Sequence, residues 1–253
     1  MSRTPGIFAV VAICLSLSGT KGLAAEGHPH WSYGGETGPG KWAKLENEFS
    51  ACGLGKTQSP IDIRDAAVKR GDLPAIGFDY KPSPLKIVDN GHTVQISYAP
   101  GSSITADGKR YELVQFHFHK PSEEKLNGKS SAMVAHLVHK DADGKLAVVA
   151  VLLATGQENP LIKTLWANIP KDKEKEVEAA SVTINVADLL PKDKAYYTFA
   201  GSLTTPPCSE GVTWFVLKHP TSVSRAEVDR FGKLYRMNAR PTQPLNGREV
   251  RGN

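Results

Sequence analysis

The chain has 253 residues, of which 40% are hydrophobic, 8% aromatic and 23% charged. This balance is typical of a globular protein, so it excludes a disordered chain, a collagen and a coiled coil, and the length suits a single domain. The formal net charge is +5 and no long block of like charge occurs, so we expect no nucleic-acid partner.

The N-terminal segment 1–25 has the organisation of a secretory signal peptide. Arg3 is followed by the apolar run Ile7–Leu17 and by small residues that end with Gly22–Ala25. The apolar run is too short to span a bilayer, and no later stretch approaches about 18 apolar residues. We therefore expect a cleaved signal peptide, a mature domain at 26–253, a periplasmic or secreted location and no membrane partner. The alternative is an uncleaved anchor.

Most of the predicted elements are strands, in which apolar and polar residues alternate with period two. The segments are, in chain order, Val94–Tyr98, Tyr111–His119, Met133–His139, the apolar run Leu146–Ala154, and Trp214–Leu217. The turn residues Asp141–Gly144 join the third segment to the fourth, so we expect a β-hairpin there.

Helices are predicted to be few and short. Apolar residues at Asn159–Ile169 have helical spacing, and Ser224–Glu227 is a capping box that opens a helix ending near Tyr235. The charged run Lys171–Glu176 is interpreted as a solvated segment. These patterns predict one mostly β (α+β) domain with short peripheral helices.

The predicted strand that ends at His119 presents two histidines on one face. Side chains alternate across a strand, so His117 and His119 point one way while Phe116 and Phe118 point into the apolar core. Two imidazoles at this spacing lie roughly 7 Å apart at Cβ, close enough to hold one ion between them.

A third metal ligand is expected from the next predicted strand. His136 shares a strand face with Val138 whereas His139 faces the other way, so His136 is the better candidate. Catalytic zinc sites use three protein ligands and one water, which matches a set of His117, His119 and His136. The residues alone leave two interpretations open, a zinc site and ordinary surface histidines.

Cysteine usage agrees with export. Cys14 would be removed with the signal peptide, which leaves Cys52 and Cys208. Two thiols in an exported chain usually form a disulfide, and the alternative is a pair of free buried thiols.

A series of short motifs runs from Trp31 to Leu245, and the H-x-H and G-S-L-T-T-P-P motifs are the most specific. The stretches are Trp31–Gly34, Gln58–Ile63, Asn90–His92, Gln115–His119, Pro121–Glu123, Ala135–His139, Gly201–Cys208 and Arg240–Leu245. In these motifs and their order the chain resembles the α-class carbonic anhydrases of the bacterial, exported type. The resemblance implies a single domain built on a large central, mainly antiparallel twisted sheet. It also implies a disulfide between the cysteines at 52 and 208.

The resemblance implies a zinc lyase that interconverts CO2 and bicarbonate. His117, His119 and His136 would hold Zn²⁺, and zinc-bound hydroxide, formed at neutral pH, would attack CO2. Thr204 would accept the proton of the hydroxide and pass its own hydroxyl proton to Glu123, which aims the nucleophile. Sulfonamides and simple anions are the expected inhibitors.

The resemblance also assigns the proton path and the substrate pocket. His92 would export the proton, because a histidine titrates near neutral pH, and Tyr33 and Asn90 would order the waters that carry it. Without the motif, His92 is an ordinary loop histidine. The residues implied around the substrate are polar Gln115 and Thr205 and apolar Val138, Val148, Leu203, Val212 and Trp214. From the residues alone, the apolar set is equally consistent with ordinary core.

Three positions depart from the family pattern. Val134 stands where many members have a glutamate that accepts a hydrogen bond from the third histidine, while Glu124 and Phe199 replace a frequent histidine and tyrosine. Histidines that bind metals usually need such an acceptor, so we expect Glu124 to take over this role for His136. The alternative is a backbone or water acceptor.

Two further expectations concern the mature N-terminus and the assembly. Cleavage after Ala25 would expose Glu26–His28, a start that can chelate Cu²⁺ or Ni²⁺ through the amine and the histidine, with a flexible start as the alternative. Family members often form homodimers, although the sequence marks no apolar strip for the contact. The alternative function is that of a non-catalytic zinc-binding relative. The absence of the usual glutamate at Val134 leaves this alternative open.

Overall fold

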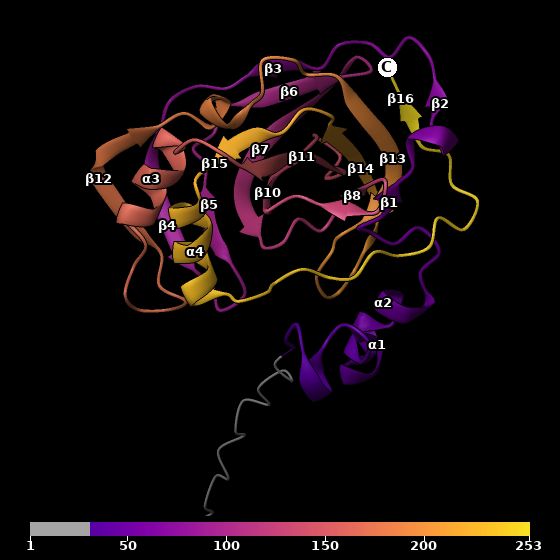
Figure 1. The fold of residues 1–253 in the computed structure, drawn as a ribbon, viewed down its shortest axis with the longest axis horizontal. Coiled ribbons are helices and arrows are strands. Elements are labelled where there is room, and N and C mark those ends of the chain that lie inside the picture. Colours follow the sequence, from indigo (N-terminus) through magenta and orange to yellow (C-terminus); the bar gives the residue numbers. More distant parts are fainter. Residues whose placement is uncertain (1–30) are drawn as a thin grey trace, which may run out of the picture.

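The structure, a computed structural model, describes residues 31–253 (Figure 1). The predicted signal peptide, its cleavage site and the Glu26–His28 motif lie outside the described residues. The strands are β1 (Asp62–Ile63), β2 (Lys69–Arg70), β3 (Gly77–Asp79), β4 (Ser83–Asp89), β5 (Val94–Ser97), β6 (Ser103–Ala106), β7 (Lys109–His119), β8 (Lys125–Leu126), β9 (Lys129–Ser130), β10 (Met133–Lys140), β11 (Leu146–Thr155), β12 (Val177–Ile184), β13 (Tyr196–Ser202), β14 (Glu210–Leu217), β15 (Thr221–Val223) and β16 (Arg251–Gly252). The α-helices are α1 (Trp42–Leu45), α2 (Ala51–Leu54), α3 (Pro160–Ala167) and α4 (Arg225–Leu234).

Within residues 31–253, 13 strands form one twisted sheet whose main path is β12-β4-β5-β7-β10-β11-β14-β13-β16-β2. Neighbours are antiparallel along most of this path, but β11 pairs with β14 in parallel, as does β16 with β2. The predicted sheet is thus confirmed, and the parallel pairs make it a mixed one. A parallel pair needs a long crossover, and the chain between β11 and β14 supplies one that includes α3.

The predicted hairpin is confirmed as β10 and β11, which pair antiparallel from Met133 opposite Leu153 to Lys140 opposite Leu146. On its other side β10 pairs antiparallel with β7, and His136 lies directly opposite His117. This register follows from the buried apolar residues, because a slip by one residue would move every side chain to the opposite face. It places the three predicted metal ligands on one face.

Apolar side chains are buried on both faces of the central strands. β11 shows this most clearly, since Val149 and Val151 belong to one buried cluster and Val148 and Leu152 to another. In β7, Phe116 and its neighbour Phe118 join the first cluster and are fully buried. Burying a side chain of this kind contributes about 1.5–3 kcal/mol, so the face opposite the histidines is held in place by its own packing.

The two predicted helices are confirmed as α3 and α4, which lie side by side next to the sheet (Figure 1). Asn159 caps α3 by accepting from the backbone N–H groups of Leu161 and Ile162. Ser224 and Glu227 form the predicted capping box of α4. No helix among the described residues is long and apolar enough to cross a membrane.

Candidate metal centre

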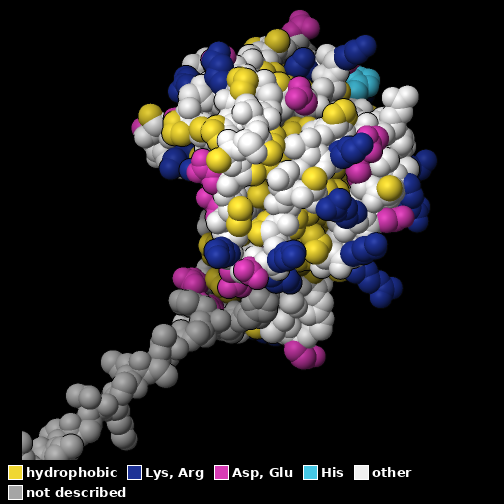
Figure 2. All heavy atoms as spheres, turned by 90° about the vertical axis from the view of Figure 1, so that its left-hand side faces the viewer, with side chains coloured by type: hydrophobic (Ala, Val, Ile, Leu, Met, Phe, Trp, Pro, Cys, Tyr) yellow, Lys and Arg dark blue, Asp and Glu magenta, His cyan; other side chains and the backbone are white. Residues whose placement is uncertain are grey.

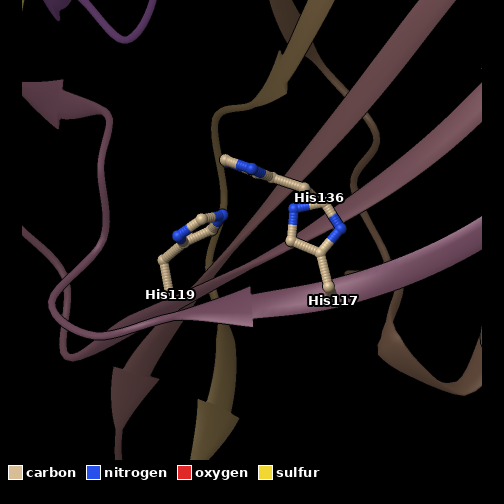
Figure 3. A group of neighbouring side chains, drawn as sticks. All are labelled: His117, His119 and His136. Carbon is tan, nitrogen blue, oxygen red and sulfur yellow. The ribbon is translucent and has the colours of Figure 1, made fainter. Parts of the chain in front are cut away.

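Three imidazole rings converge between β7 and β10 (Figure 3). His117 and His119 come from β7 and His136 from β10, and one nitrogen of each ring lies within 4.8 Å of the others. Among residues 31–253 no other residue of a metal-binding type joins this group. The structure therefore brings together the three histidines predicted as ligands.

The two β7 rings are oriented by hydrogen bonds on the nitrogens that face away from the centre. Nδ1 of His117 lies 2.8 Å from Oε1 of Gln115, and Nδ1 of His119 lies 2.7 Å from the backbone oxygen of Asn238. Because both acceptors are oxygens, each Nδ1 carries the hydrogen and each Nε2 keeps its lone pair. Both Nε2 atoms can then bind a metal.

The β10 ring is oriented by a carboxylate. Nε2 of His136 lies 3.0 and 3.2 Å from the two carboxylate oxygens of Glu124, whose side chain is buried. This confirms the expectation that Glu124 replaces the missing glutamate at position 134. Val134 belongs to the second apolar cluster, as does Phe199. His136 is left with Nδ1 toward the other two rings.

The buried atoms of the centre fit a zinc ion. Nε2 of His119 is buried and has no hydrogen-bond partner among the described residues. Leaving a buried polar atom unpaired costs about 1–3 kcal/mol, and a bound metal removes that cost. Three imidazole nitrogens with an open fourth position are the ligand set of catalytic zinc, and each ring also has the outer hydrogen-bond partner that such sites use.

The histidines differ in their affinity for protons. Burial, followed by the charge on His136, lowers the pKa of His117 to about 3. Burial and the neighbouring histidines also hold the pKa of His119 well below its ordinary value. Burial alone would lower the pKa of His136, but the charge and hydrogen bond of Glu124, with help from Glu123, outweigh it and raise the pKa. The two β7 rings are therefore neutral ligands at neutral pH.

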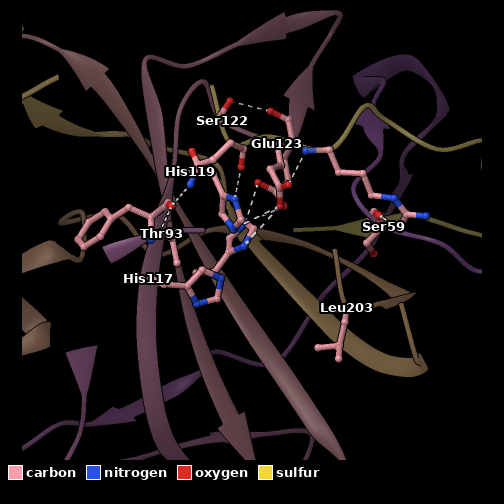
Figure 4. A network of polar contacts seen from close by, with 12 residues as sticks. Ser59, Thr93, His117, His119, Ser122, Glu123 and Leu203 are labelled. Carbon is pink, nitrogen blue, oxygen red and sulfur yellow. Dashed lines mark hydrogen bonds and ion pairs between the residues drawn. The ribbon is translucent and has the colours of Figure 1, made fainter. Parts of the chain in front are cut away.

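Glu123 lies beside the centre without joining it (Figure 4). Its Oε2 is 3.5 Å from Nε2 of His119 and 3.8 Å from Nδ1 of His136, while its Oε1 accepts from the backbone N–H of Arg240 at 2.7 Å. Burial raises the pKa of this carboxyl group to about 7, and a side-chain hydrogen bond with Thr204 opposes the rise. Oε2 still has no partner at standard hydrogen-bond geometry. Thr204 is therefore a neighbour of this carboxyl group, and the hydrogen bond expected between the two side chains stays a prediction.

A cavity of about 120 Å³ opens onto the exposed side of the β7 histidines. It is lined by the predicted polar and proton-path residues together with two rings of the triad, namely Tyr33, Asn90, His92, Gln115, Thr205, His117 and His119. Burial, with the charge of Glu123 second, raises the pKa of Tyr33 well above its ordinary value, so its hydroxyl stays protonated. The predicted water path and the metal ligands therefore share one cavity.

The turn that carries His92 is rigidly built. The Asn90 side chain accepts from the backbone N–H groups of His92 at 3.0 Å and of Thr93 at 2.9 Å. Gly91 adopts φ +84°, which favours glycine at this position. The His92 ring stacks on Trp31 with centroids 3.7 Å apart and planes within 7°. His92 therefore stands at the cavity wall with one face covered.

The five apolar residues predicted around the substrate belong to one cluster beside the triad. Val148, Val212 and Trp214 are buried, and Val138 and Leu203 pack against the same cluster at its partly exposed edge. The Trp214 ring meets the His136 ring edge-on with centroids 4.9 Å apart. None of the five lines the 120 Å³ cavity, so they form a separate apolar flank.

Several residues of the site carried no predicted role. Asn238 orients His119 through a backbone carbonyl, which leaves no signal in a sequence. Arg240 supports Glu123 through its backbone N–H, and its buried guanidinium donates to the backbone oxygens of Cys52 at 2.9 Å and Ser59 at 2.8 Å. Arg240 could have been noticed from the sequence because it begins the motif Arg240–Leu245, but that motif does not indicate what the side chain does.

The disulfide predicted between Cys52 and Cys208 is present, and it joins α2 to the turn between β13 and β14. This turn also contains Thr204 and Thr205, and the backbone N–H of Cys208 donates to the carbonyl of Thr205 at 2.8 Å. The disulfide therefore anchors the turn that contains Thr204 to α2, near the N-terminal end of the described chain.

Comparison with known proteins agrees with this geometry. The model of the eukaryotic-type carbonic anhydrase family matches residues 37–253. A carbonic anhydrase of Klebsiella pneumoniae is 46% identical over 224 residues, which are 87% of this chain and 90% of that protein. A hyperthermostable carbonic anhydrase from an active hydrothermal vent chimney superposes with a TM-score of 0.85 at 47% identity, covering 88% of this chain and 99% of the other.

A further structure is similar to the same extent. The α-carbonic anhydrase of Thermovibrio ammonificans, solved in complex with the inhibitor sulfanilamide, has a TM-score of 0.85 and 41% identity, covering 88% of this chain and 98% of the other. The sheet, the histidine triad and these matches define an enzyme of the lyase class with a metal-binding centre. The chain belongs to the α-carbonic anhydrase family. Family and triad together support CO2 hydration as its general activity.

Proposed function

We propose that this protein hydrates CO2 reversibly to bicarbonate and a proton, and that the metal in its centre is Zn²⁺. The observation that carries the proposal is the convergence of three imidazole nitrogens, each oriented by an outer hydrogen-bond partner. His117 and His119 would bind the ion through Nε2 and His136 through Nδ1. Bound zinc would lower the pKa of a water molecule to about 7 and so supply hydroxide at neutral pH.

We infer that Thr204 and Glu123 aim the attacking oxygen. The Thr204 hydroxyl would accept the proton of that oxygen and donate its own to Glu123, which orients a lone pair toward the carbon of CO2. Arg240 supports this arrangement, because its N–H bond holds one oxygen of Glu123 in place. A hydroxyl held in one orientation also disfavours bound groups that cannot donate a hydrogen bond.

We infer that His92 exports the proton that each turnover releases. It lies on the wall of the cavity that also contains His117 and His119, and Tyr33 and Asn90 lie on the same wall. Waters in this cavity would carry the proton to the His92 ring, which passes it to buffer. The apolar flank around Trp214 would hold CO2 beside the triad.

Stopped-flow measurement of CO2 hydration tests the proposal. We expect activity in the zinc-loaded protein, its loss in the presence of a strong chelator, and its return when Zn²⁺ is restored. Sulfanilamide, which is bound by the Thermovibrio relative, is expected to inhibit, as are simple anions. A chain that holds one zinc but hydrates no CO2 and ignores sulfanilamide would instead be the non-catalytic zinc-binding relative.

We propose that the protein works in the periplasm or outside the cell. The disulfide supports this location, because such bonds persist in oxidising compartments, and the signal-like sequence of residues 1–25 agrees with it. The absence of a membrane-spanning helix among residues 31–253 is compatible with a free protein there. The homodimer stays a prediction.

A further inference from the structure

A second cavity, of about 430 Å³, lies between α4 and the segment that follows α3. It shares no residue with the cavity of the metal centre, and the function proposed above makes no use of it. Its lining is partly cationic and partly apolar. The cationic residues are Lys171, Lys173, Arg230 and Lys233, and the apolar ones are Trp166, Ile169, Pro170 and Leu234.

The four cations have no acidic partners close by. Among residues 31–253, none of them lies within the 4.0 Å of a carboxylate oxygen that defines an ion pair. The Lys173 amine lies over the Tyr235 ring, 5.6 Å from its centroid, and Arg230 donates to the backbone oxygen of Trp166. Like charges that surround one hollow repel each other, and an anion in the hollow would relieve that repulsion.

The acidic residues nearby offset only part of the positive charge, because the lining holds four cations and one acid. Asp89 is the one acid in its lining, but its buried carboxylate accepts from the Tyr235 hydroxyl and from the Gly91 N–H at 3.1 Å. In the alternating run Lys171–Glu176, the lysines at 171 and 173 line the cavity, while the acids between and after them do not. Two lysines of the segment predicted as simply solvated therefore line this cavity.

The mixture of charge and apolar surface specifies the kind of ligand. Small-molecule sites are concave, largely apolar and of about 300–1,000 Å³, with a few polar groups that fix the ligand. Lysine and arginine are the usual partners of phosphate, whose monoester carries close to two negative charges and three acceptor oxygens at neutral pH. On the face that Figure 2 shows, Lys and Arg side chains lie beside exposed hydrophobic ones.

We propose that this cavity binds an organic phosphate monoester, with the phosphate among the four cations and the apolar group against Ile169 and the exposed Leu234. The two cavities have no lining residue in common, so the proposal places the ligand outside the cavity of the metal centre. The proposal is independent of CO2 hydration, so either can fail alone.

Isothermal titration of the zinc-loaded protein with phenyl phosphate tests the proposal, with sulfanilamide present at saturation to block the metal. We expect one phenyl phosphate per chain. The variant K171Q/K173Q/K233Q should bind about tenfold more weakly, because it removes three of the four positive charges that would hold the phosphate. The control K109Q/K129Q/K145Q removes the same charge from exposed lysines elsewhere and should bind as the parent does.

Three results would overturn the proposal. They are no binding of phenyl phosphate to the parent protein, equal weakening in the two triple variants, and binding that sulfanilamide abolishes. Equal weakening would show that only the overall charge matters, and loss with sulfanilamide would place the phosphate at the metal.

The phosphate monoester could belong to a soluble molecule or to a lipid headgroup, and a second arm separates these sources. Vesicles of phosphatidic acid in phosphatidylcholine are sedimented with the parent protein and with both triple variants. Co-sedimentation lost only in K171Q/K173Q/K233Q supports the site with a lipid ligand. Binding of phenyl phosphate in the titration without co-sedimentation with the vesicles supports the site with a soluble phosphate monoester as its ligand.

Discussion

The Nε2 atom of His136 lies 3.0 and 3.2 Å from the two carboxylate oxygens of Glu124, so the third metal ligand takes its acceptor from the residue that follows Glu123. The usual position on the same strand as the histidine holds Val134, which is fully buried in an apolar cluster. The carboxylate that orients His136 therefore comes from the loop between β7 and β8 and not from the histidine's own strand.

We expect Glu124→Ala to weaken Zn²⁺ binding about 10–100-fold, because the His136 ring would lose the partner that fixes its orientation and its proton. Competition with a chromogenic chelator measures the affinity directly. Glu249→Ala, which removes a half-exposed carboxylate far along the chain, is the control and should leave the affinity unchanged. Equal zinc affinity in the Glu124 variant and the parent would show that the hydrogen bond does not position the ligand.

Thr204→Val should lower kcat/KM for CO2 hydration by about 100-fold while the zinc content stays at one per chain. The substitution keeps the shape of the side chain but removes the hydroxyl that contacts Glu123. Stopped-flow kinetics with metal analysis on the same sample separates the two effects. The exposed Thr183→Val is the matched control. Full activity without the hydroxyl would contradict the role given to Thr204.

His92→Ala should reduce kcat by about tenfold or more and leave kcat/KM nearly unchanged, because proton export follows the CO2 step. Adding imidazole to a weak buffer should restore most of the lost kcat, since a small base can replace the missing ring. A variant whose kcat equals that of the parent in weak buffer would show that the proton leaves by another route.

Buried His139 predicts a pH dependence of stability that is separate from the metal centre. Burial lowers its pKa to about 4 from the ordinary 6.5, and its Nε2 lies 2.9 Å from the Tyr80 hydroxyl. Between about pH 4 and pH 6.5, therefore, His139 is protonated in the unfolded chain but neutral in the folded chain. The associated stability is complete above about pH 6.5 and is lost as the pH falls through about 4, and it amounts to about 3 kcal/mol.

The metal-free protein and its His139→Gln variant provide the comparison for this effect, because glutamine can still accept from Tyr80. Urea unfolding from pH 7 to pH 4 should show the parent losing about 3 kcal/mol more than the variant. Contributions from His117 and His119 are common to both and cancel in the difference. Parallel stability profiles would mean that His139 already carries its proton in the folded state.

The sequence predicted the elements that a repeating pattern defines. Alternation in β7 placed His117 and His119 on one face, and the parity of β10 chose His136 over His139, as the register later shows. The capping box at Ser224 located the start of α4. Patterns of this kind survive folding because each is set by burial within one element.

The rest of the site depends on contacts between distant segments, which leave no local pattern. The backbone oxygen of Asn238 orients His119, and Trp31 stacks on His92, although neither pair is close in the chain. The parallel pairing of β11 with β14 likewise depends on a long crossover that alternation cannot reveal. The cationic hollow could not be predicted because the run at Lys171 resembles any solvated charged segment.

The most direct test of the account is a crystal structure of the zinc-loaded protein with anomalous data at the zinc edge. We predict one zinc per chain, bound by Nε2 of His117, Nε2 of His119 and Nδ1 of His136, because hydrogen bonds occupy the opposite nitrogen of each ring. A fourth position filled by a side chain, or zinc bound by fewer than three of these nitrogens, would contradict the assignment.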